Sequence, residues 1–153
     1  MKQSEIMIDA INRKIIAALQ QNARVSYAEL GKRVYLSAPA VAERIRKLES
    51  AGIITGFTLK VDLDKLGYPI VALVQCKVFR TKEREFKARM LNHDEVIECH
   101  NVTGEQAFLV KLAVESMSQL DVILESFCDL SDTNTMMILS TPVDRTVPQT
   151  YFE

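Results

Sequence analysis

The chain has 153 residues, of which 48% are hydrophobic and 25% charged, values typical of a globular domain with a normal core. It has no apolar run of the length that a transmembrane helix needs, and its N-terminus lacks the pattern of a secretory signal. Cys76, Cys99 and Cys128 are odd in number and widely spaced, which fits reduced thiols in the cytoplasm better than a disulfide framework.

Charge is divided unevenly along the chain. The net charge of −1 by itself argues against a nucleic-acid-binding protein. However, residues 1–60 contain 10 Lys and Arg against 5 Asp and Glu, whereas residues 61–153 contain 9 against 15. The first segment therefore carries +5 and the second −6. This asymmetry predicts two modules, of which only the first binds a polyanion.

Two helices are predicted before residue 35. The first begins at Asp9, and its apolar residues recur at helical spacing up to Leu19. Ser26 and Glu29 form a capping box that opens the second, shorter helix. Gly31 lowers the helix propensity of this segment, but its lack of a side chain allows a crossing helix to come close.

A third helix is predicted over residues 37–51. Ser37 caps its start, Gly52 ends it, and an apolar stripe (Val41, Ile45, Leu48) faces the core. Its opposite side presents small and cationic groups, which suits a helix laid in the major groove of DNA. A plain solvated helix has the same appearance, so this helix alone does not decide the function. Two short helices after a longer one indicate a helix-turn-helix core.

Residues 53–61 are predicted to form a β-segment with a bend at Gly56. A strand after the three helices would complete a winged arrangement, in which Lys60 contacts phosphate. Three amphipathic helices could alternatively form a generic helical bundle that does not bind DNA. The charge excess, the small groups on the third helix and the wing together favour DNA binding.

The remaining residues predict a second module. Residues 61–69 are polar and end in turn formers, as in a linker. Strands are predicted over 70–79, 96–102, 107–114 and 134–141, and helices over 81–92 and 116–127. This β-α-β-β-α-β order is the ferredoxin-like arrangement. Both helices cover one sheet face, so Leu73 and Phe79 on the other face predict homodimerisation.

The sequence indicates no catalytic, cofactor or metal site. His93 is predicted in an exposed loop, and Cys99 and His100 alternate on a strand, so they point to opposite faces. The sequence contains neither metal-ligand spacing nor a phosphate-binding glycine loop. We therefore expect a protein that is not an enzyme.

The chain resembles the Lrp/AsnC, or feast/famine, family of transcription regulators over about residues 6–145. The matching residues are Ile8-Asp9, Ile15-Ile16, Leu19-Gln20, Arg24-Val25-Ser26, Glu29-Leu30, Lys32-Arg33-Val34, Leu36-Ser37, the run from Glu43 to Glu49, Gly52-Ile53-Ile54, Gly56-Phe57-Thr58, Glu98-Cys99-His100, Val102-Thr103-Gly104 and Asp132-Thr133. The run from Glu43 to Glu49 followed by Gly52-Ile53-Ile54 is the most specific match. One departure is Tyr35, where the family often has glycine; a left-handed backbone there would cost about 1–2 kcal/mol.

The resemblance implies an α+β protein: a winged helix-turn-helix DNA-binding domain (1–60), a linker (61–69), a ferredoxin-like effector-binding and oligomerisation domain (70–145) and a tail (146–153). It implies a transcription regulator that binds double-stranded promoter DNA as a homodimer, or as an octamer built from four dimers. The expected DNA-binding residues are Ser37, Pro39, Ala40, Glu43, Arg44, Arg46, Lys47 and Lys60. Pro39, Ala40 and Glu43 would approach base edges, and the cationic residues would neutralise phosphates.

In the resembled family, the hairpin after the second strand lines a pocket that takes an amino acid. The corresponding effector residues here are Val102, Thr103, Gly104, Glu105, Gln106, Thr133 and Thr135. Backbone N–H groups near Gly104 would hold a carboxylate, and the hydroxyls would add hydrogen bonds. The chain has Ala107 where the family commonly has Asp, which weakens recognition of an ammonium group. An altered ligand, no ligand, and a plain hairpin turn all stay open.

The sequence therefore leaves two hypotheses for the function. The first is an amino-acid-responsive regulator. The alternative is a small-molecule-binding ferredoxin-like protein whose N-terminal domain mediates assembly only.

Overall fold

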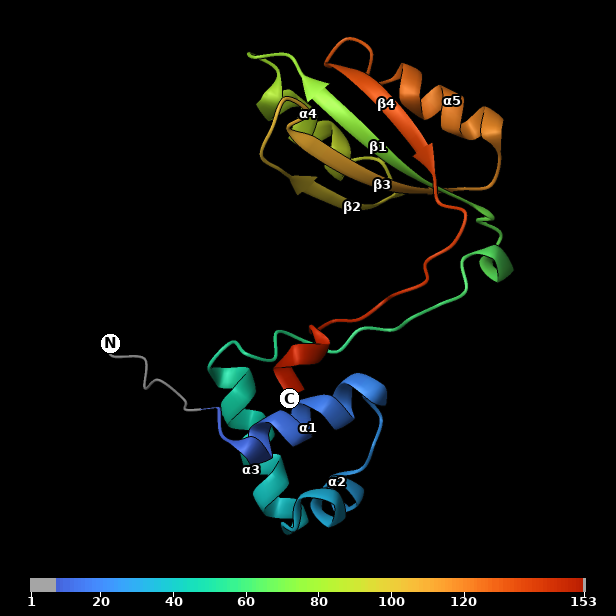
Figure 1. Ribbon diagram of the computed structural model, residues 1–153. Helices are drawn as coiled ribbons and strands as arrows, with labels where there is room; N and C mark the ends of the chain where they lie inside the picture. The colour runs from blue at the N-terminus through green and yellow to red at the C-terminus, as the bar shows by residue number, and fades with distance from the viewer. Residues whose placement is uncertain (1–7, 153) are drawn as a thin grey trace. The chain divides into compact units, whose positions relative to one another are not determined.

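Contacts within the computed structural model divide the chain into two units (Figure 1). One runs to Leu59 and takes in the segment from Val143 onward, and the other runs from Lys60 to Pro142. The structure describes residues 8–152; residues 1–7, on which the expectation about a secretory signal rested, and the last residue of the predicted tail lie outside them. In the described part of the chain, no helix combines the length and apolar character needed to cross a bilayer.

The first unit contains the predicted helix-turn-helix core. Its helices are α1 (Ala10–Gln21), α2 (Tyr27–Val34) and α3 (Ala38–Ser50). Asp9, Ser26 and Ser37 cap the three helices, each accepting a hydrogen bond from the N–H three residues ahead. The helices share one core, made by Ile15, Ala18, Leu30, Val34, Val41 and Ile45.

The turn between α2 and α3 is tight because Gly31 has no side chain. A Cβ atom at Gly31 would lie 2.3 Å from the carbonyl oxygen of Leu36. The Gly31 carbonyl oxygen also accepts hydrogen bonds from the N–H groups of Tyr35 and Leu36. Tyr35 adopts the left-handed conformation (φ 58°, ψ 43°), the case in which a residue other than glycine is strained. The close approach is thus to the turn that leads into α3.

The predicted strand over residues 53–61, and with it the wing, is wrong. Within the described residues, this segment belongs to no sheet, and residues 55–62 have no regular secondary structure. Gly52 and Gly56 take positive φ angles of 70° and 158°, and no neighbouring strand pairs with the segment. β-forming residues such as Phe57 and Leu59 cannot form a strand without such a partner.

The segment from Val143 onward packs on α1. The short 3-10 helix η2 (Gln149–Phe152) contacts α1, and the guanidinium of Arg13 lies 5.6 Å from the centre of the Tyr151 ring. A hollow of about 290 Å³ opens beside this contact, lined by Arg145, Phe152 and residues of α1. The end of the chain thus belongs to the helix-turn-helix unit.

The second unit has the predicted order of elements. After the 3-10 helix η1 (Asp64–Leu66), it contains β1 (Ile70–Val78), α4 (Glu83–Leu91), β2 (Val96–Asn101), β3 (Phe108–Val114), α5 (Met117–Glu125) and β4 (Ser131–Met137). The strands form one antiparallel sheet in the order β2-β3-β1-β4. The fourth strand begins before the predicted residue 134, because the turn after α5 ends at Leu130.

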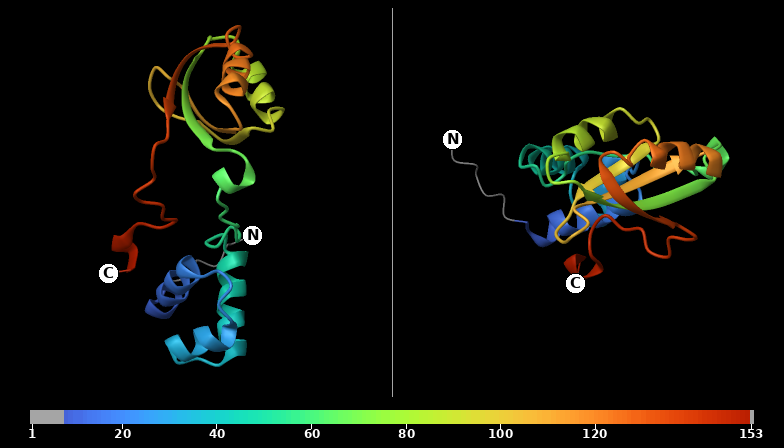
Figure 2. Two further views of the ribbon diagram at one scale, coloured as in Figure 1. Left: turned by 90° about the vertical axis from the view of Figure 1, so that its right-hand side faces the viewer. Right: turned by 90° about the horizontal axis from the view of Figure 1, so that it is seen from above.

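Both helices cover the same face of this sheet (Figure 2). The core between them contains Val74, Cys76, Phe86, Phe108 and Phe127. Leu73 alternates with Val74 and therefore lies on the other face, beside Met136 of β4. That face has no covering layer among the described residues of this unit.

Gly31→Ala tests the tight turn. Alanine favours a helix by about 1 kcal/mol over glycine, but a Cβ atom 2.3 Å from a backbone oxygen costs about 2–3 kcal/mol, the upper part of the range for overpacking. We expect the free energy of unfolding to fall by about 1–2 kcal/mol in urea titrations, because backbone atoms must shift. Lys32→Ala, at the next exposed position, should stay within about 0.5 kcal/mol of wild type. Equal stability of Gly31→Ala and wild type would contradict this packing constraint.

Candidate nucleic-acid and effector sites

The first turn of α3 presents small side chains. The Ser37 hydroxyl accepts a hydrogen bond from the Ala40 N–H at 3.4 Å, so Ser37 is occupied as the helix cap. Pro39 is exposed in this turn, where its missing N–H is not needed, and Ala40 is half-buried. With no long side chain here, the end of α3 can approach another surface closely.

One turn further along, Glu43, Arg46 and Lys47 form a cluster of charges. Arg46 donates to the Glu43 carboxylate at 2.6 and 3.0 Å, and the Lys47 ammonium lies 3.6 Å from it. The Arg46 hydrogen bond is the main cause that lowers the pKa of Glu43. The Arg46 and Lys47 side chains remain 72% and 62% exposed, so the cluster offers one net positive charge to solvent.

Arg44, expected to contact phosphate, makes contacts within the first unit. Its Nη1 donates to Asp9 Oδ2 at 2.8 Å and to Asn12 Oδ1 at 2.9 Å, and Asn12 is only 5% exposed. The pKa of Asp9 is lowered by the N–H of Asn12 first and by Arg44 second. This guanidinium thus joins α3 to the start of α1. The sequence gives a weak signal for it, since Arg44 lies on the flank of the apolar stripe.

Lys60 falls at the boundary between the two units. It is exposed, lies in the irregular segment after α3, and belongs by its contacts to the second unit.

In the second unit, the predicted hairpin residues come together around a hollow of about 340 Å³. Residues 102–106 line it, joined by Gln75 of β1 and by Phe108 and Leu109 of β3. Glu105 forms an ion pair with Lys77 of β1, which lowers the pKa of Glu105 and raises that of Lys77. Gly104 has a φ of 114°, which a side chain would strain. The hairpin is therefore held to β1 by a charge pair and turns through a glycine.

Thr133 and Thr135 do not line this hollow. They pair with Cys76 and Val74 in the β1–β4 ladder, so they lie on the helix-covered side, whereas Gln75 lies on the other. Ala107 does not line it either. Its carbonyl oxygen accepts from the Val102 N–H at 2.8 Å and from the Asn101 amide at 3.1 Å, and its side chain packs on the core.

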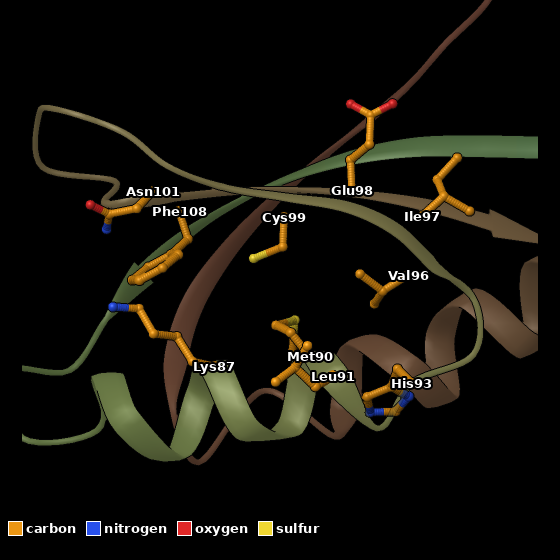
Figure 3. Close-up of a pocket in the computed structure, with 10 residues that line it drawn as sticks. All are labelled: Lys87, Met90, Leu91, His93, Val96, Ile97, Glu98, Cys99, Asn101 and Phe108. Atoms are coloured by element: carbon orange, nitrogen blue, oxygen red, sulfur yellow. The ribbon is translucent and has the colours of Figure 1, made fainter. Parts of the chain in front are cut away.

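A second hollow, of about 550 Å³, lies between α4 and β2 (Figure 3). Met90, Val96 and Phe108 make much of its apolar lining, and the Cys99 side chain points toward α4. The Lys87 ammonium lies 5.4 Å from the centre of the Phe108 ring. Sequence patterns did not reveal this hollow, because its walls come from two elements whose spacing is a tertiary property.

The two histidines are held by neighbouring side chains. His93 lies in the loop between α4 and β2, as predicted, but the loop does not leave it exposed: its side chain is 22% exposed, its ring packs on Phe127 at 5.4 Å, and it lies 3.1 Å from the Ser126 hydroxyl. His100 faces away from Cys99, as predicted, and lies 3.1 Å from the Glu98 carboxylate. Over residues 8–152, no cluster of three or more His, Cys, Asp or Glu side chains is placed to bind a metal ion.

The chain matches two described domain families. Residues 8–49 match the AsnC-type helix-turn-helix domain, and residues 71–148 match the Lrp/AsnC ligand binding domain. Among curated relatives, the transcriptional regulator LrpC of Bacillus subtilis is 33% identical over 133 residues, which cover 87% of this chain and 92% of that protein. The regulator FL11 of Pyrococcus horikoshii is 31% identical over 144 residues, which cover 92% and 95%.

Solved structures have the same fold over more than nine tenths of the chain. B. subtilis LrpC superposes with a TM-score of 0.84 at 32% identity, covering 91% of this chain and 99% of that one. E. coli AsnC superposes with a TM-score of 0.79 at 31% identity, covering 92% of this chain and 98% of that one. The feast or famine regulatory protein Rv3291c of Mycobacterium tuberculosis, in complex with L-methionine, gives 0.83 at 26% identity, covering 93% and 99%. The chain therefore belongs to the Lrp/AsnC family of helix-turn-helix transcriptional regulators.

Proposed function

We propose that this regulator binds promoter DNA sequence-specifically through α3, oligomerises through its sheet domain and responds to an amino acid or a similar small metabolite. The observation that carries the proposal is the surface of α3, where small residues in the first turn precede an exposed cationic cluster. A helix of this kind can place its N-terminal residues against base edges while its basic residues bind phosphates. Such a role is exercised in the cytoplasm, where promoter DNA is accessible.

Within α3, we assign base reading to Pro39, Ala40 and Glu43, and phosphate binding to Arg46 and Lys47. The ion pairs with Glu43 hold both cations near the exposed face. Arg44 is left out of the phosphate contacts, because its guanidinium is bound to Asp9 and Asn12. A dimer would then bind a roughly palindromic operator with half-sites about 10 bp, or a multiple of that, apart.

The uncovered sheet face is the surface proposed for dimerisation. Val71 and Leu73 of β1 lie on it, together with Leu109 of β3, which is opposite Gln75, and Met136 of β4, which is opposite Leu73. Lys111 of β3, on the other side of Leu73, is paired with Glu98. The four apolar side chains are only partly shielded, and Met136 is 40% exposed. Pairing two such faces by a twofold axis would remove this apolar surface from water. Four dimers would build the octamer that the family resemblance implies.

The hairpin hollow is the proposed effector site. Its volume of about 340 Å³ is in the range of small-molecule pockets. A relative from M. tuberculosis has been solved with L-methionine, which supports an amino acid as the ligand class. N–H groups around Gly104 can bind the carboxylate. The ammonium group has no carboxylate at Ala107, and Glu105 is already paired with Lys77. Recognition should therefore depend mainly on the ligand carboxylate.

Arg46→Ala/Lys47→Ala tests the DNA-binding surface. The double variant should bind DNA from its own upstream region more weakly, and the slope of log K against log salt should flatten by about 0.9 per lost phosphate contact. Fluorescence anisotropy across a salt series measures both quantities. Absence of binding by folded wild-type protein at low salt would overturn the regulator proposal and favour the assembly-only alternative.

Two controls accompany this experiment. Lys65→Ala/Arg80→Ala removes one lysine and one arginine from the second unit and should leave the slope unchanged. Arg44→Ala should leave the slope unchanged too. It should lower the free energy of unfolding by about 1–2 kcal/mol, because the buried Asn12 loses its charged partner. If Arg44→Ala instead flattened the slope of log K against log salt without loss of stability, Arg44 would be a phosphate contact.

Leu73→Glu tests dimerisation through the sheet. A carboxylate there must be desolvated if two faces pack together, so we expect the variant to sediment as a monomer and wild type as a dimer or larger assembly. Leu139→Glu makes the same change at a side chain that is 94% exposed after β4, and it should keep the wild-type mass. Circular dichroism confirms that both variants are folded. A Leu73→Glu protein with the wild-type mass would rule out this interface.

Thermal-shift measurements with L-methionine and the other amino acids test the effector site. A true ligand at about 100 times its Kd should stabilise the protein by about 2.7 kcal/mol. The methyl ester of that ligand should lose the shift, whereas the N-acetyl form should retain most of it. The reverse order would show that the ammonium group dominates recognition. No shift with any amino acid would exclude an amino-acid effector.

A further inference from the structure

Tyr35 is unusual in its backbone. Among residues 8–152, it is the only residue other than glycine with a positive φ angle. Its φ and ψ of 58° and 43° lie in the left-handed region, which an L side chain other than Asn or Asp visits rarely. Glycine would take this conformation without the clash between Cβ and backbone.

The turn, and not Tyr35 itself, determines this conformation. The Gly31 carbonyl oxygen accepts from the N–H groups of both Tyr35 and Leu36, and Gly31 packs against the Leu36 carbonyl. These contacts involve only backbone atoms at position 35. Any residue there would be held in the left-handed region, so the tyrosine side chain is not required for the turn.

The tyrosine side chain also contributes little packing to the unit. Tyr35 is 92% exposed, the largest exposure of any aromatic residue that the structure describes. Its phenol ring has no aromatic, cationic or hydrogen-bonding partner among residues 8–152. A bulky aromatic group therefore stands in solvent at a position where it strains the backbone. That combination indicates a partner outside the chain.

The surroundings of Tyr35 indicate the chemistry of that partner. Lys32 and Arg33 lie in the last turn of α2 and are exposed, and Ser37, two residues ahead, caps α3. Tyr35 is thus placed between a cationic helix end and the turn of α3 assigned to base reading. When the N-terminal end of such a helix enters a groove, the phosphates at the groove edge lie beside the preceding turn.

We propose that Tyr35 is a DNA-backbone contact, whose phenolic O–H donates to a phosphate oxygen while its ring lies against the adjoining deoxyribose. The inference rests on the proposed DNA binding by α3. Tyrosine hydroxyls are among the groups that bind phosphates, and such contacts fix the register of a protein on the duplex without reading sequence. Tyr35 therefore contributes to affinity for specific and non-specific DNA alike.

Two variants of the full chain test this contact. Tyr35→Phe keeps the ring and the strain, so its unfolding midpoint should match wild type while its affinity for DNA falls about 3- to 10-fold through loss of one hydrogen bond. Tyr35→Gly removes the ring and the backbone strain. Its thermal unfolding midpoint should therefore rise by about 2–4 °C, while its affinity for DNA falls about 10-fold or more. Tyr68→Phe, which removes a phenol from the second unit, should change neither quantity.

Affinities are measured on a duplex from the protein's own upstream region and on a random duplex of equal length. For both Tyr35 variants, the two affinities should fall by the same factor, because a phosphate contact carries no sequence information. Wild-type protein that binds neither duplex would overturn the proposed function itself. If wild type binds and Tyr35→Gly binds equally well, only the role of Tyr35 is overturned. Loss confined to the upstream duplex would make Tyr35 a base-reading residue and overturn the backbone contact.

Discussion

The place of α3 in the first unit depends on a contact that only glycine permits, that of Gly31 with the Leu36 carbonyl. Because the two backbones touch, the turn has no room for an alternative path, and Tyr35 must be left-handed. The Ser37 cap then begins α3 at a fixed residue. A second constraint acts at the side of the helix, where Arg44 binds Asp9 and Asn12 of α1. Together these contacts orient the exposed charges of α3.

The second unit depends on the two faces of its central strand. Along β1, Val74 and Cys76 face the helices, and burial raises the pKa of the Cys76 thiol to about 12, which keeps it protonated and unreactive. The residues that alternate with them, on the opposite face of the strand, have two different roles. Leu73 contributes to an apolar surface, while Lys77 holds the hairpin through Glu105. A single strand thus joins the surface proposed for assembly to the loop proposed for the effector.

Local signals in the sequence were enough to predict most of the fold. Ser26 and Ser37 indicated where α2 and α3 begin, and alternation along residues 70–78 indicated a strand with two faces. The wing failed because a strand needs a partner, and β propensity alone does not provide one. The contacts of Arg44 also could not be predicted, because its partners lie 35 and 32 residues away in the sequence. Thr133 and Thr135 were grouped with the hairpin by family resemblance, whereas the ladder places them on the opposite sheet face from Gln75.

The packing of η2 on α1 has a consequence for the order in which the protein is made. Because the segment from Val143 onward belongs to the first unit, residues 60–142 are in effect inserted within that unit. On the ribosome, the helices of the first unit emerge early, but their final contacts wait until the end of the chain is synthesised. The sheet domain can fold in the meantime and bring the two flanking segments closer than an unfolded insert would. Its folding would thereby reduce the loop-closure entropy that docking of η2 must overcome.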